Sequence, residues 1–211
     1  DQHWQLFKGM VTRVCFGVNS VDWLYTRIIL DGEQLDLAKC TFKNFKRVLD
    51  MKKGTLTREF IWKTETGKEI KVTFLRFLSM DKPNMGFQKI SFEPLNFSGN
   101  IQVQSGLDYS ILHEIAEGWN QVETSDSEFK ARGRNFWTLV KTENKGCGIS
   151  AMGKTIKSGH LLFSNFRLNS NKELNTSFRQ QEKLVILDFS LELKKGESSV
   201  IEKSVVNYWE K

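Results

Sequence analysis

The histidines of this 211-residue chain are the first candidates for acid–base chemistry. His3, His113 and His160 lie far apart, and none has the second histidine at i+2 or i+4 that is typical of a metal site. A general acid–base pair would need a histidine and a carboxylate in one cleft, such as His113 or His160 with Asp188 or Glu192. No spacing brings these residues together, so we expect the histidines to lie on the surface or in packed positions.

Paired carboxylates are the second candidate, because glycoside cleavage usually uses two carboxyl groups that face each other across the bond. Five carboxylates fall in or beside expected strands: Glu59, Glu69, Glu93, Asp108 and Glu192. Their spacing brings no two of them together. We therefore name no catalytic, cofactor-binding or metal-binding residue, and no cofactor.

One segment matches a phosphate-binding loop. Residues 148–155, GISAMGKT, fit the pattern G-x-x-x-x-G-K-[ST]. Such a loop needs a strand before it and a helix after it. Here the segment itself alternates like a strand and no βαβ pattern surrounds it, so we interpret the match as chance.

Aromatic and arginine side chains could also bind ligands. Five tryptophans could stack on sugar rings, although core packing is favoured for each of them: Trp23, Trp62, Trp119, Trp137 and Trp209. Arg58 and Arg76 fall on an otherwise apolar strand face. We expect their guanidinium groups to reach toward solvent or to pair with buried carboxylates.

Composition indicates an ordinary folded protein, with 39% hydrophobic and 27% charged residues. The net charge of +6 is spread among acidic residues, which favours a solvated sheet face over a nucleic-acid site. Cys15, Cys40 and Cys147 are odd in number and lack metal-ligand spacing, so structural free thiols are expected. No apolar run approaches the roughly 20 residues that span a bilayer, so we expect no membrane segment.

Residues 55–76 predict a β-hairpin. Alternation from Leu56 to Trp62 resumes after Gly67, and a three-residue loop with a left-handed Gly67 would connect the two strands. Pairing Thr64 with Lys68 places both apolar sets on one face, in the pairs Trp62–Ile70, Phe60–Val72 and Arg58–Phe74. Another register would scatter these residues.

Further alternating segments predict an all-β fold. The expected strands are 23–30, 35–37, 42–49, 86–92, 101–107, 136–141, 149–156, 161–166, 184–193 and 199–207. Residues 169–181 read as a surface loop, residues 110–126 could form a short amphipathic helix, and residues 1–22 fit neither period. About eleven short strands with polar turns favour one sandwich domain over residues 1–211.

Several of these segments resemble the N-terminal domain of glycoside hydrolase family 65, which includes maltose, kojibiose and trehalose phosphorylases and acid trehalases. The motifs LDGEQLDL, FKRVLDMKKGTLTREFIW, TGKEIKVTFLRFLS and EPLNFSGNIQVQSGLD occur in the family's order across residues 23–107. The segment ELKKGESSVIEK at 192–203 resembles the closing strands. The Gly-Asn-Gly-type turn of the family is missing, which implies that an N-terminal segment is absent.

The resemblance implies a large two-sheet supersandwich similar to galactose mutarotase. It further implies a non-catalytic domain that braces a helical (α/α)₆ catalytic barrel and aids subunit association, so a homodimer is possible. The family's general acid belongs to that barrel. The alternative is a free-standing carbohydrate-binding or mutarotase-like domain. The chain begins with Asp1, which suggests a trimmed segment; a cytoplasmic location is favoured, and a periplasmic or secreted one is possible if a signal was removed.

One strand carries apolar residues on both faces. Leu75 and Phe77 lie opposite Ile70, Val72 and Phe74, and Leu78 extends the run. A sheet that faces water on one side would carry polar residues there. We expect either a surface that packs against the barrel, or cover by residues 110–119 of the same domain.

Overall fold

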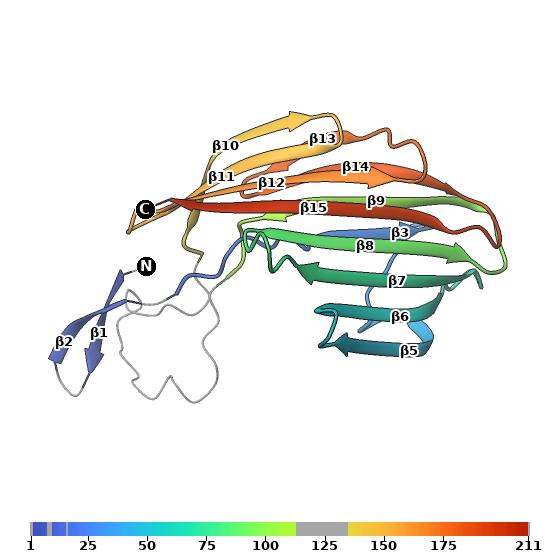
Figure 1. The fold of residues 1–211 in the computed structure, drawn as a ribbon, viewed down its shortest axis with the longest axis horizontal. Coiled ribbons are helices and arrows are strands. Elements are labelled where there is room, and N and C mark those ends of the chain that lie inside the picture. The colour runs from blue at the N-terminus through green and yellow to red at the C-terminus, as the bar shows by residue number, and fades with distance from the viewer. Residues whose placement is uncertain (1, 8–9, 16, 113–134, 211) are drawn as a thin grey trace.

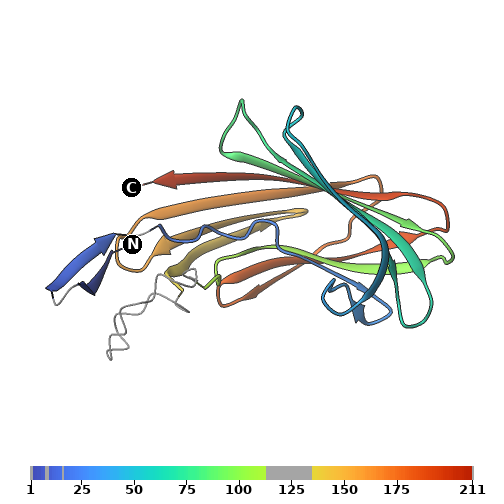
Figure 2. The same ribbon diagram turned by 90° about the horizontal axis from the view of Figure 1, so that it is seen from below.

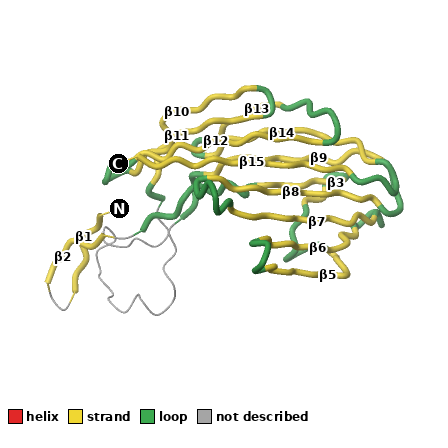
Figure 3. Tube along the Cα trace, viewed as in Figure 1, coloured by secondary structure: helices red, strands yellow, loops and turns green. Residues whose placement is uncertain are grey.

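The computed structural model describes residues 2–7, 10–15, 17–112 and 135–210, and these contain strands and loops without a helix (Figure 3). The strands are β1 (Gln2–Phe7), β2 (Met10–Cys15), β3 (Thr26–Leu30), β4 (Glu33–Gln34), β5 (Thr41–Asp50), β6 (Thr55–Lys63), β7 (Glu69–Leu78), β8 (Met85–Pro94), β9 (Gly99–Asp108), β10 (Trp137–Lys145), β11 (Gly148–Thr155), β12 (Leu161–Ser170), β13 (Ser177–Gln181), β14 (Leu184–Leu193) and β15 (Ser199–Glu210). The described part therefore holds no helix that could span a membrane.

Two antiparallel sheets form the expected sandwich (Figure 1). The larger sheet has the order β10-β11-β12-β15-β8-β7-β6-β5, and the smaller has the order β13-β14-β9-β3-β4. Among the described strands, β1 and β2 pair only with each other. Figure 2 shows that β5, β6 and β7 twist strongly relative to the rest of the larger sheet, as strand chirality favours. The predicted all-β, two-sheet fold is confirmed.

The core lies between the two sheets because alternate residues of each strand point inward. Strands of the larger sheet contribute Phe60, Trp62, Val72, Phe92 and Phe166, and strands of the smaller sheet contribute Leu30, Ile101, Leu107, Val185 and Leu187. All of these belong to one buried cluster.

The predicted hairpin is present in the predicted register. Trp62 pairs with Ile70, Phe60 with Val72 and Arg58 with Phe74. The Thr64 amide donates to the Lys68 carbonyl at 2.9 Å, and Gly67 has a φ of +81°. Glycine adopts this left-handed conformation without steric cost, which lets a three-residue loop join the strands.

The prediction of a surface loop over 169–181 was wrong for its second half. Ser177–Gln181 forms β13, which pairs with β14 along the edge of the smaller sheet. Most of its residues are exposed. Backbone hydrogen bonds to β14 hold this strand in place, and its mostly polar side chains show no alternation of apolar residues that the sequence could reveal.

The expected strand at 35–37 was also wrong. Strand β4 is only Glu33–Gln34, and the chain then turns. The Asp36 side-chain carboxylate accepts a hydrogen bond from the Ala38 amide, and the Asp36 backbone carbonyl accepts one from the Cys40 amide. These two hydrogen bonds form a turn, so the backbone here does not continue the strand. In the segment expected as a helix, Ser110–Leu112 have no regular structure and residues 113–126 lie outside the described part.

Candidate functional site

His160 lies far from Glu192, its first candidate partner. His160 immediately precedes β12, whose first residue pairs with Glu210 at the end of β15. Glu192 lies in β14, at the end of the sandwich where β15 begins. The length of β15, on the order of 35 Å, therefore separates His160 from Glu192. Asp188, the other candidate, forms an ion pair with Arg179 (Nε–Oδ2 3.1 Å). His160 therefore has neither partner.

Three of the five candidate carboxylates have partners of their own. Glu59 forms an ion pair with Lys71 at 3.1 Å and Glu69 forms one with Lys43 at 2.9 Å. The Asp108 carboxylate accepts the backbone N–H two residues later. Among the described residues no interaction joins any two of these five, and no group of three His, Cys, Asp or Glu side chains could hold a metal ion.

The phosphate-loop match is a strand. Gly148–Thr155 forms β11, paired with a strand on each side, so its backbone amides do not form a phosphate cradle. Cys40 and Cys147 are free thiols, as expected, and burial raises the pKa of Cys40.

The tryptophans divide into buried and exposed side chains. Trp62 and Trp137 are buried and Trp23 is half-buried, in agreement with core packing. Trp209 is 51% exposed, so core packing was the wrong expectation there. It lies at the end of β15, beyond the last residue that pairs with β8, and its ring packs 4.8 Å from that of His160. The side chains of His3, His113, Cys15 and Trp119 lie outside the described part.

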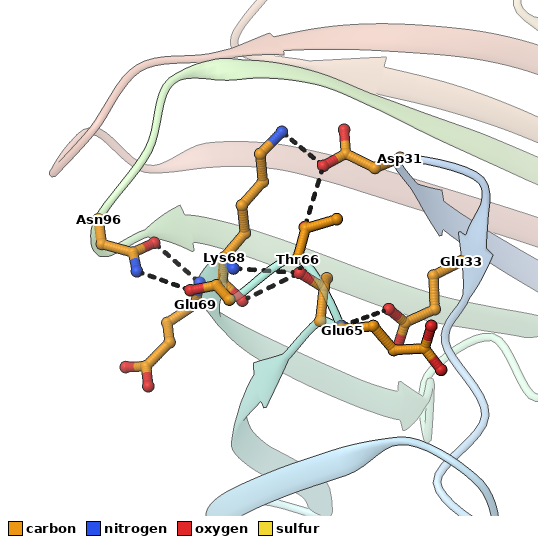
Figure 4. Close-up of polar contacts among 9 residues, drawn as sticks. Asp31, Glu33, Glu65, Thr66, Lys68, Glu69 and Asn96 are labelled. Carbon is orange, nitrogen blue, oxygen red and sulfur yellow. Dashed lines mark hydrogen bonds and ion pairs between the residues drawn. The ribbon is translucent and has the colours of Figure 1, made fainter.

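A network of polar contacts joins the β6–β7 turn to the β3–β4 turn of the smaller sheet (Figure 4). Lys68 Nζ lies 2.6 Å from Asp31 Oδ2. The Glu33 carboxylate accepts hydrogen bonds from the Glu65 amide at 2.9 Å and from the Trp62 indole at 3.3 Å. These contacts join two segments that belong to the motifs of the family resemblance, residues 30–34 (LDGEQ) and residues 66–69 (TGKE). They hold the edge of the smaller sheet against the hairpin.

A crevice opens between the two sheets, beside the β6–β7 hairpin, where the hairpin extends past the smaller sheet. It consists of adjoining hollows of about 420 and 120 Å³ that share Arg58, Phe74, Arg76 and Gln88. The opposite wall comes from the chain between the residues before β3 and those after β4, and includes Leu24, Arg27, Gln34 and Asp36. Arg47 of β5 lines the smaller hollow. We call the two hollows together the arginine crevice.

Of the two arrangements expected for Arg58 and Arg76, the ion pair with a buried carboxylate is not found among the described residues. No ion pair joins Arg47, Arg58 or Arg76 to any described carboxylate. The Arg58 guanidinium instead lies 4.6 Å from the centre of the Phe74 ring. Burial lowers the pKa of Arg58, and the charges of Arg76 and Arg47 lower it further.

Sequence reasoning missed Arg47. The register of β5 shifts between Lys43 and Lys46, and Asn44 has a φ of +56°, which marks a bulge. Beyond this irregularity Arg47 pairs with Arg58, so both side chains lie on the same face. An asparagine within the strand was the available signal, because asparagine tolerates a positive φ better than most residues.

An apolar patch lies on the outer face of the larger sheet. Phe77 is 37% exposed and Leu75 is half-buried, so neither is enclosed in the core. Phe77 stacks on Phe87 with ring centroids 4.8 Å apart. Cross-strand pairing continues the patch through Met85, Val206, Tyr208, Phe163 and Met152. We call these seven residues (Phe77, Met85, Phe87, Met152, Phe163, Val206 and Tyr208) the outer patch.

Comparisons with known proteins agree with the motifs and the fold. The family model for the glycosyl hydrolase family 65 N-terminal domain matches residues 6–211. Kojibiose phosphorylase of Halothermothrix orenii is 28% identical over 202 residues, which cover 96% of this chain and 24% of that protein. Alpha,alpha-trehalose phosphorylase of Thermoanaerobacter brockii is 27% identical over 197 residues, covering 92% and 24%.

A solved structure from the human microbiome, described as a kojibiose phosphorylase, superposes with a TM-score of 0.80 at 32% identity. The match covers 96% of this chain and 24% of that one. The chain thus spans about a quarter of the length of the curated relatives that it matches. It belongs to the glycosyl hydrolase family 65 N-terminal domain family.

Proposed function

We propose that this chain is the non-catalytic N-terminal domain of a family 65-type disaccharide phosphorylase or hydrolase, where it braces a helical catalytic barrel and aids subunit association. Kojibiose and trehalose phosphorylases are among its relatives, and each is about four times as long as the matched region. Four of the candidate carboxylates, those of Glu59, Glu69, Asp108 and Asp188, are bound to cations or to the backbone, which supports a role outside the chemistry.

The outer patch is the observation that carries this proposal. Aromatic and aliphatic side chains from five neighbouring strands (β7, β8, β15, β12 and β11) line one region of the outer face. Elsewhere that face carries ion pairs such as Lys89–Glu202 at 3.3 Å. A contiguous exposed apolar region with a polar surround is typical of a protein interface. Phenylalanine, tyrosine and methionine are also enriched in interfaces.

The occupant that we propose for the outer patch is the catalytic barrel of the same parent protein. A partner in the same polypeptide meets the patch at high effective concentration, so it needs less buried area than a stable dimer does. The patch therefore supports a bracing role for one face of the larger sheet.

The non-catalytic part of the proposal is tested with the purified chain and maltose, trehalose or kojibiose, each with and without phosphate. We expect no phosphate uptake and no glucose release. Turnover that persists through repurification and disappears on heat inactivation of the chain would contradict a non-catalytic role. Sugar binding without turnover, measured by calorimetry, would favour the carbohydrate-binding alternative.

A further inference from the structure

The arginine crevice concentrates positive charge that the described residues do not neutralise. Arg47, Arg58 and Arg76 on the larger sheet and Arg27 on the opposite wall supply four cationic groups. The one carboxylate among the described lining residues, Asp36, lies on the opposite wall and has Lys39 3.6 Å away as its own partner. Like charges gathered in a partly desolvated hollow repel each other, and the lowered pKa of Arg58 reflects this environment. Gathering these charges in one crevice is therefore electrostatically unfavourable unless an anion offsets them.

The two central arginines occupy a defined surface. Arg58 and Arg76 are both half-buried on the inner face of β6 and β7, and Phe74 lies on that face between them in the ladder. Stacking on Phe74 restrains the Arg58 guanidinium, and a restrained planar group loses less entropy when it binds an anion. The arrangement resembles a prepared anion site more than a flexible surface cluster.

The charge and size of the crevice indicate what it would hold. A single carboxylate carries one negative charge, whereas a phosphate monoester carries about −1.5 to −2 at neutral pH and presents three acceptor oxygens. The larger hollow, about 420 Å³, lies within the range of small-molecule sites and leaves room beyond a phosphate group. Gln34 and Asp36 on the opposite wall offer partners for hydroxyl groups.

We propose that the arginine crevice binds a phosphate dianion, either free phosphate or the monoester of a small hydroxyl-rich molecule such as a hexose. Arg58 and Arg76 hold the phosphate oxygens, Arg47 adds charge at the rim, and the wall after β4 faces the body of the ligand. This inference goes beyond the bracing role and does not depend on it, because the crevice lies on the inner face and the outer patch on the other.

The test is calorimetric titration of the full chain with inorganic phosphate and, separately, with glucose 1-phosphate. Sodium chloride and sodium acetate at matched ionic strength control for general screening. The variants are Arg58→Met and Arg76→Met, which keep the aliphatic bulk of the side chain. Arg167→Met, an exposed arginine of β12 in the same sheet, is the matched control.

We expect saturable binding to the wild type and to Arg167→Met, and at least a tenfold rise in Kd for each crevice variant. Tighter binding of glucose 1-phosphate than of phosphate assigns the site to an organic monoester, and equal binding assigns it to free phosphate. Binding that is equal in all variants, or no response beyond that to acetate and chloride, would overturn the proposal.

Thermal melts keep the test informative if a variant is poorly folded. Removing one of the repelling charges should leave the Tm of the ligand-free variant equal to or above that of the wild type. Phosphate should raise the Tm of the wild type and not that of Arg76→Met. A crevice variant whose ligand-free Tm falls, with phosphate still raising it as in the wild type, would show that the arginines serve only the fold.

Discussion

Lys203 should make the stability of this domain depend on pH between neutral and alkaline conditions. Its side chain is buried between the sheets, where Nζ donates to the Gly106 carbonyl at 2.7 Å and lies 4.4 Å from the centre of the Phe166 ring. Burial lowers the pKa of Lys203 to about 7, and the charge of Asp22 only partly opposes this effect. In the unfolded chain the ordinary value is about 10.4.

The sign follows from the protons bound in each state. Between pH 7 and about 10 the native state holds fewer protons on Lys203 than the unfolded state, so the free energy of unfolding rises with pH. Below the native pKa both states are protonated, and this contribution to stability is at its lowest. One group contributes about 1.4 kcal/mol per pH unit at most, so the rise from pH 7 to pH 9 is about 2–3 kcal/mol.

The assay is urea unfolding of the wild type and of Lys203→Met at several pH values from 6 to 9. The difference in unfolding free energy between the two proteins should shift by about 2–3 kcal/mol in favour of the wild type across pH 7 to 9. Using the difference cancels the other titrating groups. Lys154→Met, which removes an exposed lysine of β11, is the control. Parallel pH profiles for the wild type and Lys203→Met would refute the lowered pKa.

Two further predictions concern packing. Phe60→Ala should lower the unfolding free energy by about 3–5 kcal/mol because Phe60 is fully buried. Thr57→Ala, on the outer face of the same strand, should cost under about 1 kcal/mol. Equal small losses in denaturant melts would show that the packing of the hairpin is misassigned. Gly153→Ala should cost about 1–3 kcal/mol because the added Cβ would overlap the Tyr109 ring. Gly99→Ala, where the nearest atom would lie 3.9 Å from the Cβ, should cost less, and a reversed order in thermal melts would contradict this contact.

The sequence predicted those parts of the fold that depend on local pattern. The β6–β7 register followed from alternation and from one glycine at the turn, because a shift by one residue would expose Phe60 and Trp62. Strand β14 has the predicted bounds, Leu184–Leu193, since its inward residues are all apolar. Strand β13 escaped prediction because a polar edge strand depends on pairing with a distant partner rather than on its own pattern.

The candidate site was less predictable because it depends on how the sheets meet. The sequence identified Arg58 and Arg76 as unusual on an apolar face, but their surroundings depend on where the smaller sheet ends. Arg47 joins them only through the bulge in β5. Leu75 and Phe77 were predicted to face outward, and the structure confirms this; the rest of the outer patch comes from strands distant in sequence.

The central claim is that the outer patch docks against the catalytic part of the parent protein. The most direct measurement is calorimetric titration of this chain into the separately produced remainder of that protein. Wild type is compared with a Phe77→Ser/Phe87→Ser double variant and with Thr57→Ala, which lies on the same face outside the patch. We predict saturable binding that is at least tenfold weaker for the double variant and unchanged for Thr57→Ala. The claim is contradicted if the two folded parts do not associate, or if they associate equally well without the two phenylalanines.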